Sequence, residues 1–409
     1  MEIFHLFSAL ITISAVFAYI NFRYLKLPNS IGLMLISLIF SLLVLTSASF
    51  FPSLKALISE QLEQISFSEL LLEVMLSFML FAGAIHIKIN DLKSEKLSII
   101  LFSTISVVLS TFIIGFAAYY ILNFFEIQIS FINCLLFGAL ISPTDPIAVL
   151  SILKSAGVSK SLETKIAGES LFNDGVAVVV FMTILQLTKP DAEVSFSSVS
   201  ILFGQEALGG VLLGAIIGWL GFKLIASIDN YQVEVLITLA VVMGGYTLAH
   251  FMHVSGPLAM VVAGLITGNK GKNFGMSEIT ANYIDKFWEL IDEILNAVLF
   301  VLIGLELLII QTNNTVLLIA FVFIGLVLVT RYISVFIPSI FISLKEKIDQ
   351  RTLMVMTWGG LRGGISIALA LSVPNDFNKE ILVTITYVIV CFSILVQGMT
   401  IGRMAQRLS

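Results

Sequence analysis

Two short stretches place acidic side chains beside hydroxyl and amide groups inside long apolar runs. The first, 142–146, reads Ser-Pro-Thr-Asp-Pro, so the carboxylate of Asp145 stands next to two prolines. Proline removes a backbone donor and restricts the preceding residue, so a helix should break here and leave carbonyl oxygens free. Carboxylate, hydroxyl and carbonyl oxygens suit hard cations. The pattern predicts an ion site, although a structural kink capped by Asp145 explains it as well and is compatible with binding.

The second stretch, 168–175, reads Gly-Glu-Ser-Leu-Phe-Asn-Asp-Gly. On a helix, Ser170 and Asp174 share one face at i,i+4, and Glu169 and Asn173 share another. One face therefore offers a carboxylate and a hydroxyl as ligands, and the other offers a carboxylate that needs a positive partner. We predict that Asp174 binds an ion and that Glu169 belongs to an ion pair. The alternative is that both acids are structural.

A third stretch, 358–364, surrounds Arg362 with four glycines. Glycines weaken a helix and let other backbone approach closely, so we predict a second interrupted helix here. Arginine stays charged even when buried. Arg362 is therefore the predicted partner of Glu169.

Weaker candidates are charged or histidine side chains elsewhere in apolar segments. Glu306 and Arg331 are predicted to pair structurally, and Glu73 lies in the outer part of its segment. His250 and His253 fit interfacial histidines better than a metal site or pH sensor. Three further acids could form a negative funnel for cations or simply a solvated helix end; these are Glu289, Asp292 and Glu293.

The composition places these motifs in a membrane. Of 409 residues, 58% are hydrophobic and only 12% are charged, with a mean hydropathy of +1.04 and a net charge of −5. These values exclude a soluble enzyme, a disordered chain and a nucleic-acid binder. Cys134 and Cys391 lie in apolar runs and are expected to be reduced packing residues. A charge at bilayer depth costs at least ~2.5 kcal/mol, so each buried acid needs a reason.

Thirteen apolar segments predict an all-α polytopic membrane protein that forms one transmembrane domain, 1–409, with no soluble domain. The segments are 3–20, 29–51, 67–87, 97–125, 131–153, 166–187, 205–226, 233–252, 256–268, 285–309, 315–343, 352–372 and 380–402. Of 22 Lys and Arg residues, seventeen fall in one set of alternate loops and three in the other. The positive-inside rule then places the N-terminus outside and the C-terminus in the cytoplasm of a cell inner (plasma) membrane.

The odd number of segments suggests internal symmetry. Segments 1–6 and 8–13 form two six-helix units, and the seventh segment makes the second unit enter from the opposite side. The two predicted breaks, in segments 5 and 12, are both in the fifth helix of their unit. Discontinuous helices at equivalent positions of inverted repeats indicate a transport site.

The three motifs together resemble the Na+/H+ antiporters of the NhaP/NHE branch of monovalent cation/proton antiporters. The motifs 142–146, 168–175 and 359–364 occur in the family's order, and the thirteen-segment plan covers essentially the whole chain. The resemblance implies a homodimer in a lipid bilayer. It also implies a dimerisation part from segments 1–2 and 7–9, and a core from segments 3–6 and 10–13 that moves like an elevator.

The resemblance also implies roles for single residues. Asp174 binds a cation or a proton in turn, and Asn173, where the other branch has Asp, is associated with electroneutral one-for-one exchange. Arg362 stabilises the crossed broken helices by pairing with Glu169. The implied Na+ ligands are Asp174, Asp145, Ser170 and the main-chain carbonyl of Thr144.

One position departs from the family pattern. Many prokaryotic members carry Glu after a Leu-Phe pair in the third segment, but here Ala82 follows Leu80 and Phe81. Glu73 lies nine residues earlier, about 13.5 Å along a helix, so it cannot simply substitute. The expected site has one carboxylate fewer, which leaves the ion preference open.

The expected function is exchange of Na+, and also Li+, for H+ without a cofactor. If the core moves only when Asp174 is neutralised by a proton or a cation, coupled exchange follows. A K+/H+ or broad cation/proton antiporter is the alternative. More distant alternatives are an uncoupled cation channel and an intramembrane aspartyl protease using Asp145 and Asp174, neither of which has the Gly-x-Gly-Asp context of such enzymes.

Overall fold

The structure is a computed structural model that describes residues 2–47, 67–145, 147–188, 195–271, 275–310, 313–343 and 348–408. Within these ranges the chain forms helices and no strand, which confirms the predicted all-α class. In the described part, nine helices are long and apolar enough to cross a membrane. Each of the thirteen predicted segments contains one helix or a run of consecutive helices. The number of membrane crossings and the inverted repeat stay predictions.

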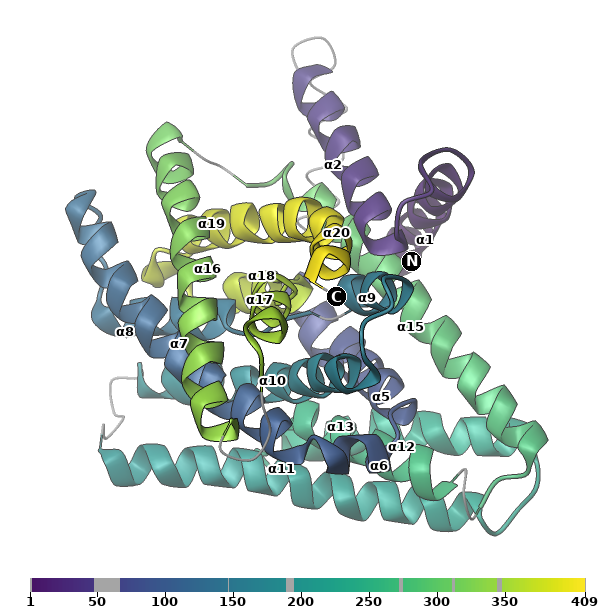
Figure 1. Ribbon diagram of the computed structural model, residues 1–409. Coiled ribbons are helices and arrows are strands. Elements are labelled where there is room, and N and C mark those ends of the chain that lie inside the picture. The colour runs from purple at the N-terminus through teal and green to yellow at the C-terminus, as the bar shows by residue number, and fades with distance from the viewer. Residues whose placement is uncertain are drawn as a thin grey trace.

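Figure 1 shows the helices in their order along the chain. The first half contains α1 (Glu2–Ile20), the π-helix η1 (Asn21–Leu25), α2 (Asn29–Ser47), α4 (Phe67–Glu69), the π-helix η2 (Leu70–Met75), α5 (Leu76–Ile85), α6 (Ile89–Ser94), α7 (Lys96–Phe124), α8 (Phe131–Ile141), α9 (Ile147–Ser155) and α10 (Lys160–Leu187). The second half contains α11 (Phe196–Ile225), α12 (Tyr231–Phe251), α13 (Gly256–Ile266), η3 (Thr267–Gly271), α15 (Glu278–Glu306), α16 (Asn314–Ile342), α17 (Gln350–Trp358), α18 (Gly364–Ser372), η4 (Asn375–Phe377), α19 (Lys379–Phe392), η5 (Ser393–Gln397) and α20 (Gly398–Leu408).

Three helices begin six to nine residues before the apolar segment that predicted them. They are α10, α11 and α15, and each starts at a serine N-cap: Ser159, Ser195 and Ser277 accept backbone hydrogen bonds from the first turn. An apolar run reports only the part of a helix that lipid or protein covers. The polar first turns outside that part were therefore missed.

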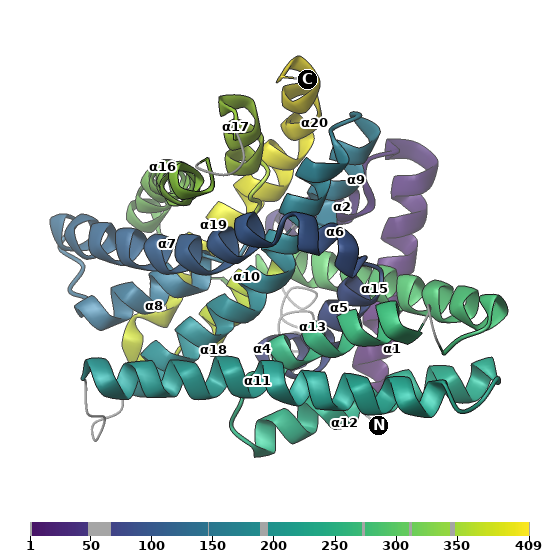
Figure 2. The same ribbon diagram turned by 60° about the horizontal axis from the view of Figure 1, so that its bottom comes forward.

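Helices α11, α12 and α13 form a layer along the bottom of both ribbon views (Figures 1 and 2). Gly210, Gly214 and Gly218 recur every four residues on α11, and a Cβ at Gly214 would lie 2.3 Å from the carbonyl oxygen of Ala259 in α13. Small residues at this spacing allow close helix packing in membranes. On its other side α13 packs along α5, while α15 packs along α1 and α2.

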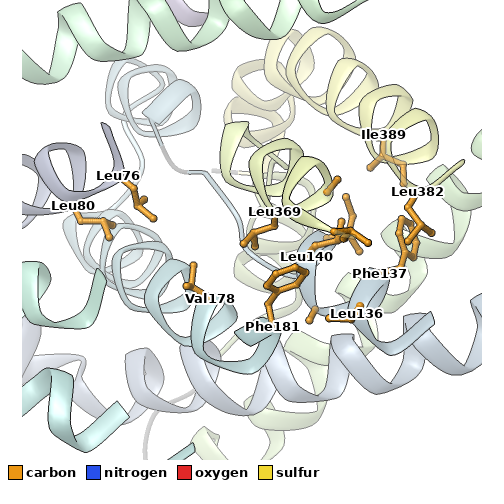
Figure 3. Close-up of a cluster of buried hydrophobic side chains, with 14 of the residues drawn as sticks. Leu76, Leu80, Leu136, Phe137, Leu140, Val178, Phe181, Leu369, Leu382 and Ile389 are labelled. Carbon is orange, nitrogen blue, oxygen red and sulfur yellow. The ribbon is translucent and has the colours of Figure 1, made fainter. Parts of the chain in front are cut away.

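A second group of helices encloses the discontinuous segments. Helix α7 packs against α8, α10 and α16, and α16 packs against α17 and α19. Apolar side chains of α5, α8, α10, α18 and α19 meet in one buried cluster, which is shown in Figure 3. The labelled members include Leu80, Phe137, Phe181, Leu369 and Leu382. Lipid tails are as apolar as these side chains, so the cluster stabilises the protein through van der Waals packing.

The structure confirms both predicted interruptions. Residues 142–145 are not helical between α8 and α9, and residues 359–363 are not helical between α17 and α18. The predicted boundary between segments 8 and 9 is also confirmed, since α12 ends at Phe251 and α13 begins at Gly256 with Ser255 as its N-cap. Pro146 and the end of the second predicted segment, 48–51, lie outside the described residues.

Candidate ion-binding site

The two interrupted helices meet at their breaks. The backbone N–H of Asp145 donates to the carbonyl of Leu361 at 2.8 Å. In the opposite direction, the Nη1 atom of Arg362 donates to the carbonyl oxygens of Ser142 and Pro143, the latter at 3.0 Å. Backbone carbonyls freed by a helix break are costly at membrane depth unless they find donors. Arg362, which is 1% exposed, supplies these donors and joins the two breaks.

Side chains of η5 form hydrogen bonds with the backbone of the second break, 359–363, and with the preceding Trp358. The N–H of Arg362 donates to the hydroxyl of Ser393 at 2.9 Å, and this hydroxyl donates to Gln397 at 2.6 Å. Gln397 in turn donates to the carbonyl of Trp358 at 3.0 Å. Gly363 completes the approach, because a Cβ there would lie 2.5 Å from the Oδ2 atom of Asp145.

Polar side chains of the 168–175 motif on α10 contact the first break, 142–145. The Nδ2 atom of Asn173 donates to the Oγ1 atom of Thr144 at 2.7 Å, and the hydroxyl of Ser170 donates to the Thr144 carbonyl. Asn173, 1% exposed, therefore holds Thr144 in place. The second lone pair of the carbonyl and those of the hydroxyl remain available for a cation.

A cavity of about 360 Å³ lies where α5, α10, α15 and the two breaks meet. Its polar lining includes Thr144, Asp145, Ser170 and Asp174. The four residues predicted as ligands therefore line the same cavity. Asp174 is 7% exposed, and its Oδ1 atom has no hydrogen-bond partner. A buried carboxylate oxygen without a donor is stabilised only by a proton or a cation.

The predicted salt bridge between Glu169 and Arg362 was wrong in its partner. Glu169, 2% exposed, pairs with Arg331 of α16 through Oε1 and Nη1 at 2.6 Å. Arg331 also donates to the carbonyl of Met356 at 3.2 Å, which ties α10, α16 and α17 together. Sequence separation could not distinguish the two arginines, because either can reach Glu169 in some packing of the helices.

The predicted pair of Glu306 with Arg331 was also wrong, because Arg331 pairs with Glu169. Glu306 is 8% exposed and lies at the other end of α15, beside Lys379 and Asn375, on a separate cavity of about 250 Å³. Glu73 is exposed in η2, apart from the ion cavity.

The histidines predicted at the interface are exposed. His250 lies in the last turn of α12, and His253 follows with a left-handed backbone (φ 53°). In the described part of the chain, no group of three or more His, Cys, Asp or Glu is placed to hold a metal ion.

Asp292 and His86 connect the ion cavity to a second cavity of about 630 Å³ between α1, α2, α5 and α15. Asp292 and His86 line both spaces, while Glu289 and Glu293 line only the second. His86 pairs with Asp285 at 3.3 Å. We call the larger space the vestibule.

Two residues of the cavity were missed in the sequence. His86 is the C-cap of α5, and Ser366 is the third residue of α18; both line the cavity. Ser366 is fully buried and its Oγ atom has no partner. A hydroxyl in the first turn after a glycine-rich break was the available signal, since it lacks the helical carbonyl to which a mid-helix serine donates.

Comparison with known proteins gives a consistent result. The family model described as sodium/hydrogen exchanger, transmembrane, matches residues 11–407. The chain is 48% identical over 409 residues to the Na(+)/H(+) antiporter NhaP of Pseudomonas aeruginosa, covering 98% of this chain and 96% of that protein. It is 33% identical to the Na(+)/H(+) antiporter NhaH of Halobacillus aidingensis, covering 94% and 93%.

The fold is similar to that of a solved transporter. The structure of the sodium proton antiporter MjNhaP1 from Methanocaldococcus jannaschii at pH 8 matches with a TM-score of 0.77 and 20% identity, over 100% of this chain and 99% of that chain. Together with the apolar helices, these matches describe a multi-pass membrane protein. The chain belongs to the sodium/hydrogen exchanger family, which is a family of transporters and not of enzymes.

Proposed function

We propose that this protein exchanges Na+, and also Li+, for H+ across the membrane, with Asp174 binding either ion in competition. The observation that carries the proposal is the buried, unpartnered Oδ1 atom of Asp174 on a cavity that also presents Asp145, Ser170 and the Thr144 carbonyl. The relatives are named Na(+)/H(+) antiporters, which supports Na+ and H+ as the two exchanged ions.

Charge balance gives the exchange its coupling. A charged Asp174 at this depth is costly, and either a proton or a monovalent cation removes one unit of charge. If the protein changes its open side only when Asp174 is neutralised, each cycle moves one cation against one proton. Asn173 is neutral and bonded to Thr144, so the residue that precedes Asp174 in the chain carries no additional proton. These features support electroneutral one-for-one exchange.

The cavity and the vestibule support an inward-facing state. The lining residues from Leu76 to His86 lie in the half of the third segment that sequence places toward the cytoplasm, and those from Ala167 to Asp174 lie between the cytoplasmic end and the middle of α10. Most labelled side chains of the cluster in Figure 3 lie on α8, on the second half of α10 and on α18, which sequence places toward the outside. The cluster would exclude water on the outer side until the core moves.

The packing favours a division of the protein that differs from the predicted one. Helix α5 packs along α13, and α15 packs along α1 and α2, so both belong by contact with the predicted dimerisation helices. We therefore propose that α7–α10 and α16–α20 form the moving core and that α1, α2, α5, α11–α13 and α15 form the stationary part of a homodimer. The termini would lie outside (N) and in the cytoplasm (C).

The test is dye-reported lumen pH in proteoliposomes with an imposed pH gradient and a clamped membrane voltage. We expect NaCl and LiCl, but not choline chloride, to dissipate the gradient, independently of voltage. Asp174→Asn should abolish this response, because a neutral amide can neither bind a proton nor neutralise a bound cation. Asp376→Asn, in the exposed turn η4, is the matched control and should transport normally.

Each other result identifies a different function. Dissipation by KCl as well would mean a broad or potassium-preferring exchanger. Voltage-dependent Na+ entry without proton movement would mean a channel. Full exchange in folded Asp174→Asn would refute the site.

A further inference from the structure

Helix α15, which belongs to the proposed stationary part, contributes an acidic residue to the ion cavity. Its acidic residues follow a helical pattern in which Asp292 alone lines the ion cavity, while Glu289 and Glu293 line only the vestibule. Asp292 is half-buried and lines the cavity together with Asp145 and His86. The cavity therefore contains a third carboxylate beside Asp145 and Asp174.

The lining of this cavity contains more acidic than basic side chains. Its ionisable lining residues are Asp145, Asp174, Asp292 and His86, and His86 is already paired with Asp285. Neither buried arginine nearby lines the cavity: the Nη1 atom of Arg362 donates to backbone carbonyls, and Arg331 pairs with Glu169. Three carboxylates around about 360 Å³ repel one another unless cations or protons join them.

Independent polar atoms in the same cavity point to a ligand. The Oδ1 atom of Asp174 and the Oγ atom of Ser366 are both buried and without hydrogen-bond partners. Ser366 lies on α18 and Asp174 on α10, so the unpartnered atoms come from two helices. Oxygen atoms arranged in this way suit a hard cation.

We propose that Asp292 is a third acidic group of the inward-facing site and holds the cation through water where it enters from the vestibule, because the three carboxylates line one cavity but are not placed to ligate one ion directly. This inference rests on the proposed exchange function and names a residue that binds on one side only. Helix α15 packs along α1 and α2, whereas Asp145 and Asp174 lie on the core. When the core moves, these two carboxylates separate from Asp292, so the outward-facing site has one carboxylate fewer.

A functional asymmetry follows. On the cytoplasmic side, Asp292 adds negative charge to the site and favours the cation. On the outer side the same site lacks this charge, binds the cation more weakly and releases it. The protein should therefore be half-saturated at a lower Na+ concentration from the cytoplasmic side than from outside.

The experiment measures half-saturating Na+ for proton exchange in everted and in right-side-out membrane vesicles. Asp292→Asn should raise it about tenfold in everted vesicles, where the cytoplasmic side faces the medium, and less than about twofold in right-side-out vesicles. Glu293→Gln removes the same charge one residue away in the vestibule and should raise it by at most about twofold. Asp292→Glu should restore most of the wild-type value.

Control measurements separate the possible failures. Equal thermal unfolding of Asp292→Asn and wild type excludes a folding defect. Equal effects of Asp292→Asn and Glu293→Gln would overturn the ligand role, and equal effects in both vesicle orientations would overturn the one-sided role. Either result leaves the exchange function intact as long as the wild type exchanges Na+ for H+ and Asp174→Asn does not. A wild type with no exchange would instead refute the proposed function.

Discussion

The buried pair of Glu169 and Arg331 is the contact whose removal should most clearly test the packing of the core. Arg331→Met keeps most of the side-chain volume and removes the charge, and Glu169→Gln removes the opposite charge with almost no change of shape. The two residues are 2% and 4% exposed and 2.6 Å apart. Arg331→Met therefore leaves a carboxylate buried without a countercharge.

The expected magnitude follows from this burial. Removing one partner of a buried ion pair costs about 3–5 kcal/mol, whereas replacing both partners by well-packed neutral groups is often nearly neutral. Arg331→Met also loses the donor to the Met356 carbonyl, a further ~1 kcal/mol. The double variant should be more stable than the sum of the single changes predicts, by roughly 1–3 kcal/mol.

The measurement is equilibrium unfolding of purified protein in detergent micelles, followed by tryptophan fluorescence. Trp358 ends α17 next to this network; replacing the other two tryptophans, Trp219 and Trp288, by Phe in all variants makes the signal local. A parallel cycle with Arg362→Met and Glu169→Gln controls for general charge effects in the core. Arg362 donates to the carbonyls of the first break, so its coupling to Glu169 should be the smaller of the two.

The comparison of the two cycles decides the assignment. Larger coupling of Glu169 to Arg362 than to Arg331 would refute the structural pairing and restore the one expected from the motifs. Additive effects in both cycles would show that Glu169 has no specific partner.

Two further predictions concern the break and a helix cap. Gly363→Ala should reduce exchange more than tenfold, because the added Cβ would lie 2.5 Å from the Asp145 carboxylate. Gly325→Ala in α16 is the control and should exchange normally, because nothing lies within 4 Å of a Cβ there. Equal activity of both variants would contradict the close approach of Gly363 to Asp145. Hydrogen bonds from the side chain and the backbone N–H of Thr352 lower the pKa of Asp349, the N-cap of α17, below its ordinary value. Asp349→Ala should destabilise the protein by about 1 kcal/mol at pH 7, and, because a lowered folded-state pKa stabilises only above the unfolded value, this difference should shrink below about pH 4. Unfolding measured at pH 7 and pH 3 tests this, and a difference that stays constant would assign the cap's effect to something other than its charge.

Local sequence determined the helices, their two breaks and the residue types of the site. Proline on both sides of Thr144-Asp145 and the glycines around Arg362 make a continuous helix unfavourable whatever surrounds it. The i,i+4 spacing of Ser170 and Asp174 places them on one helix face through helix geometry alone, and both line the cavity in the structure. These features depend on neighbours in the chain, so they could be read from it.

Tertiary packing decided which of these groups meet. The choice of Arg331 over Arg362 as the partner of Glu169 depends on how α10, α16 and α17 pack, and both arginines lie more than 150 residues away along the chain. In the sequence Asp292 is one of several acids in its segment, and only the packing of α15 against α5 and α2 places it on the same cavity as Asp145. Coulomb interactions depend on distance in space and on burial, and neither is recorded in the local pattern of the sequence.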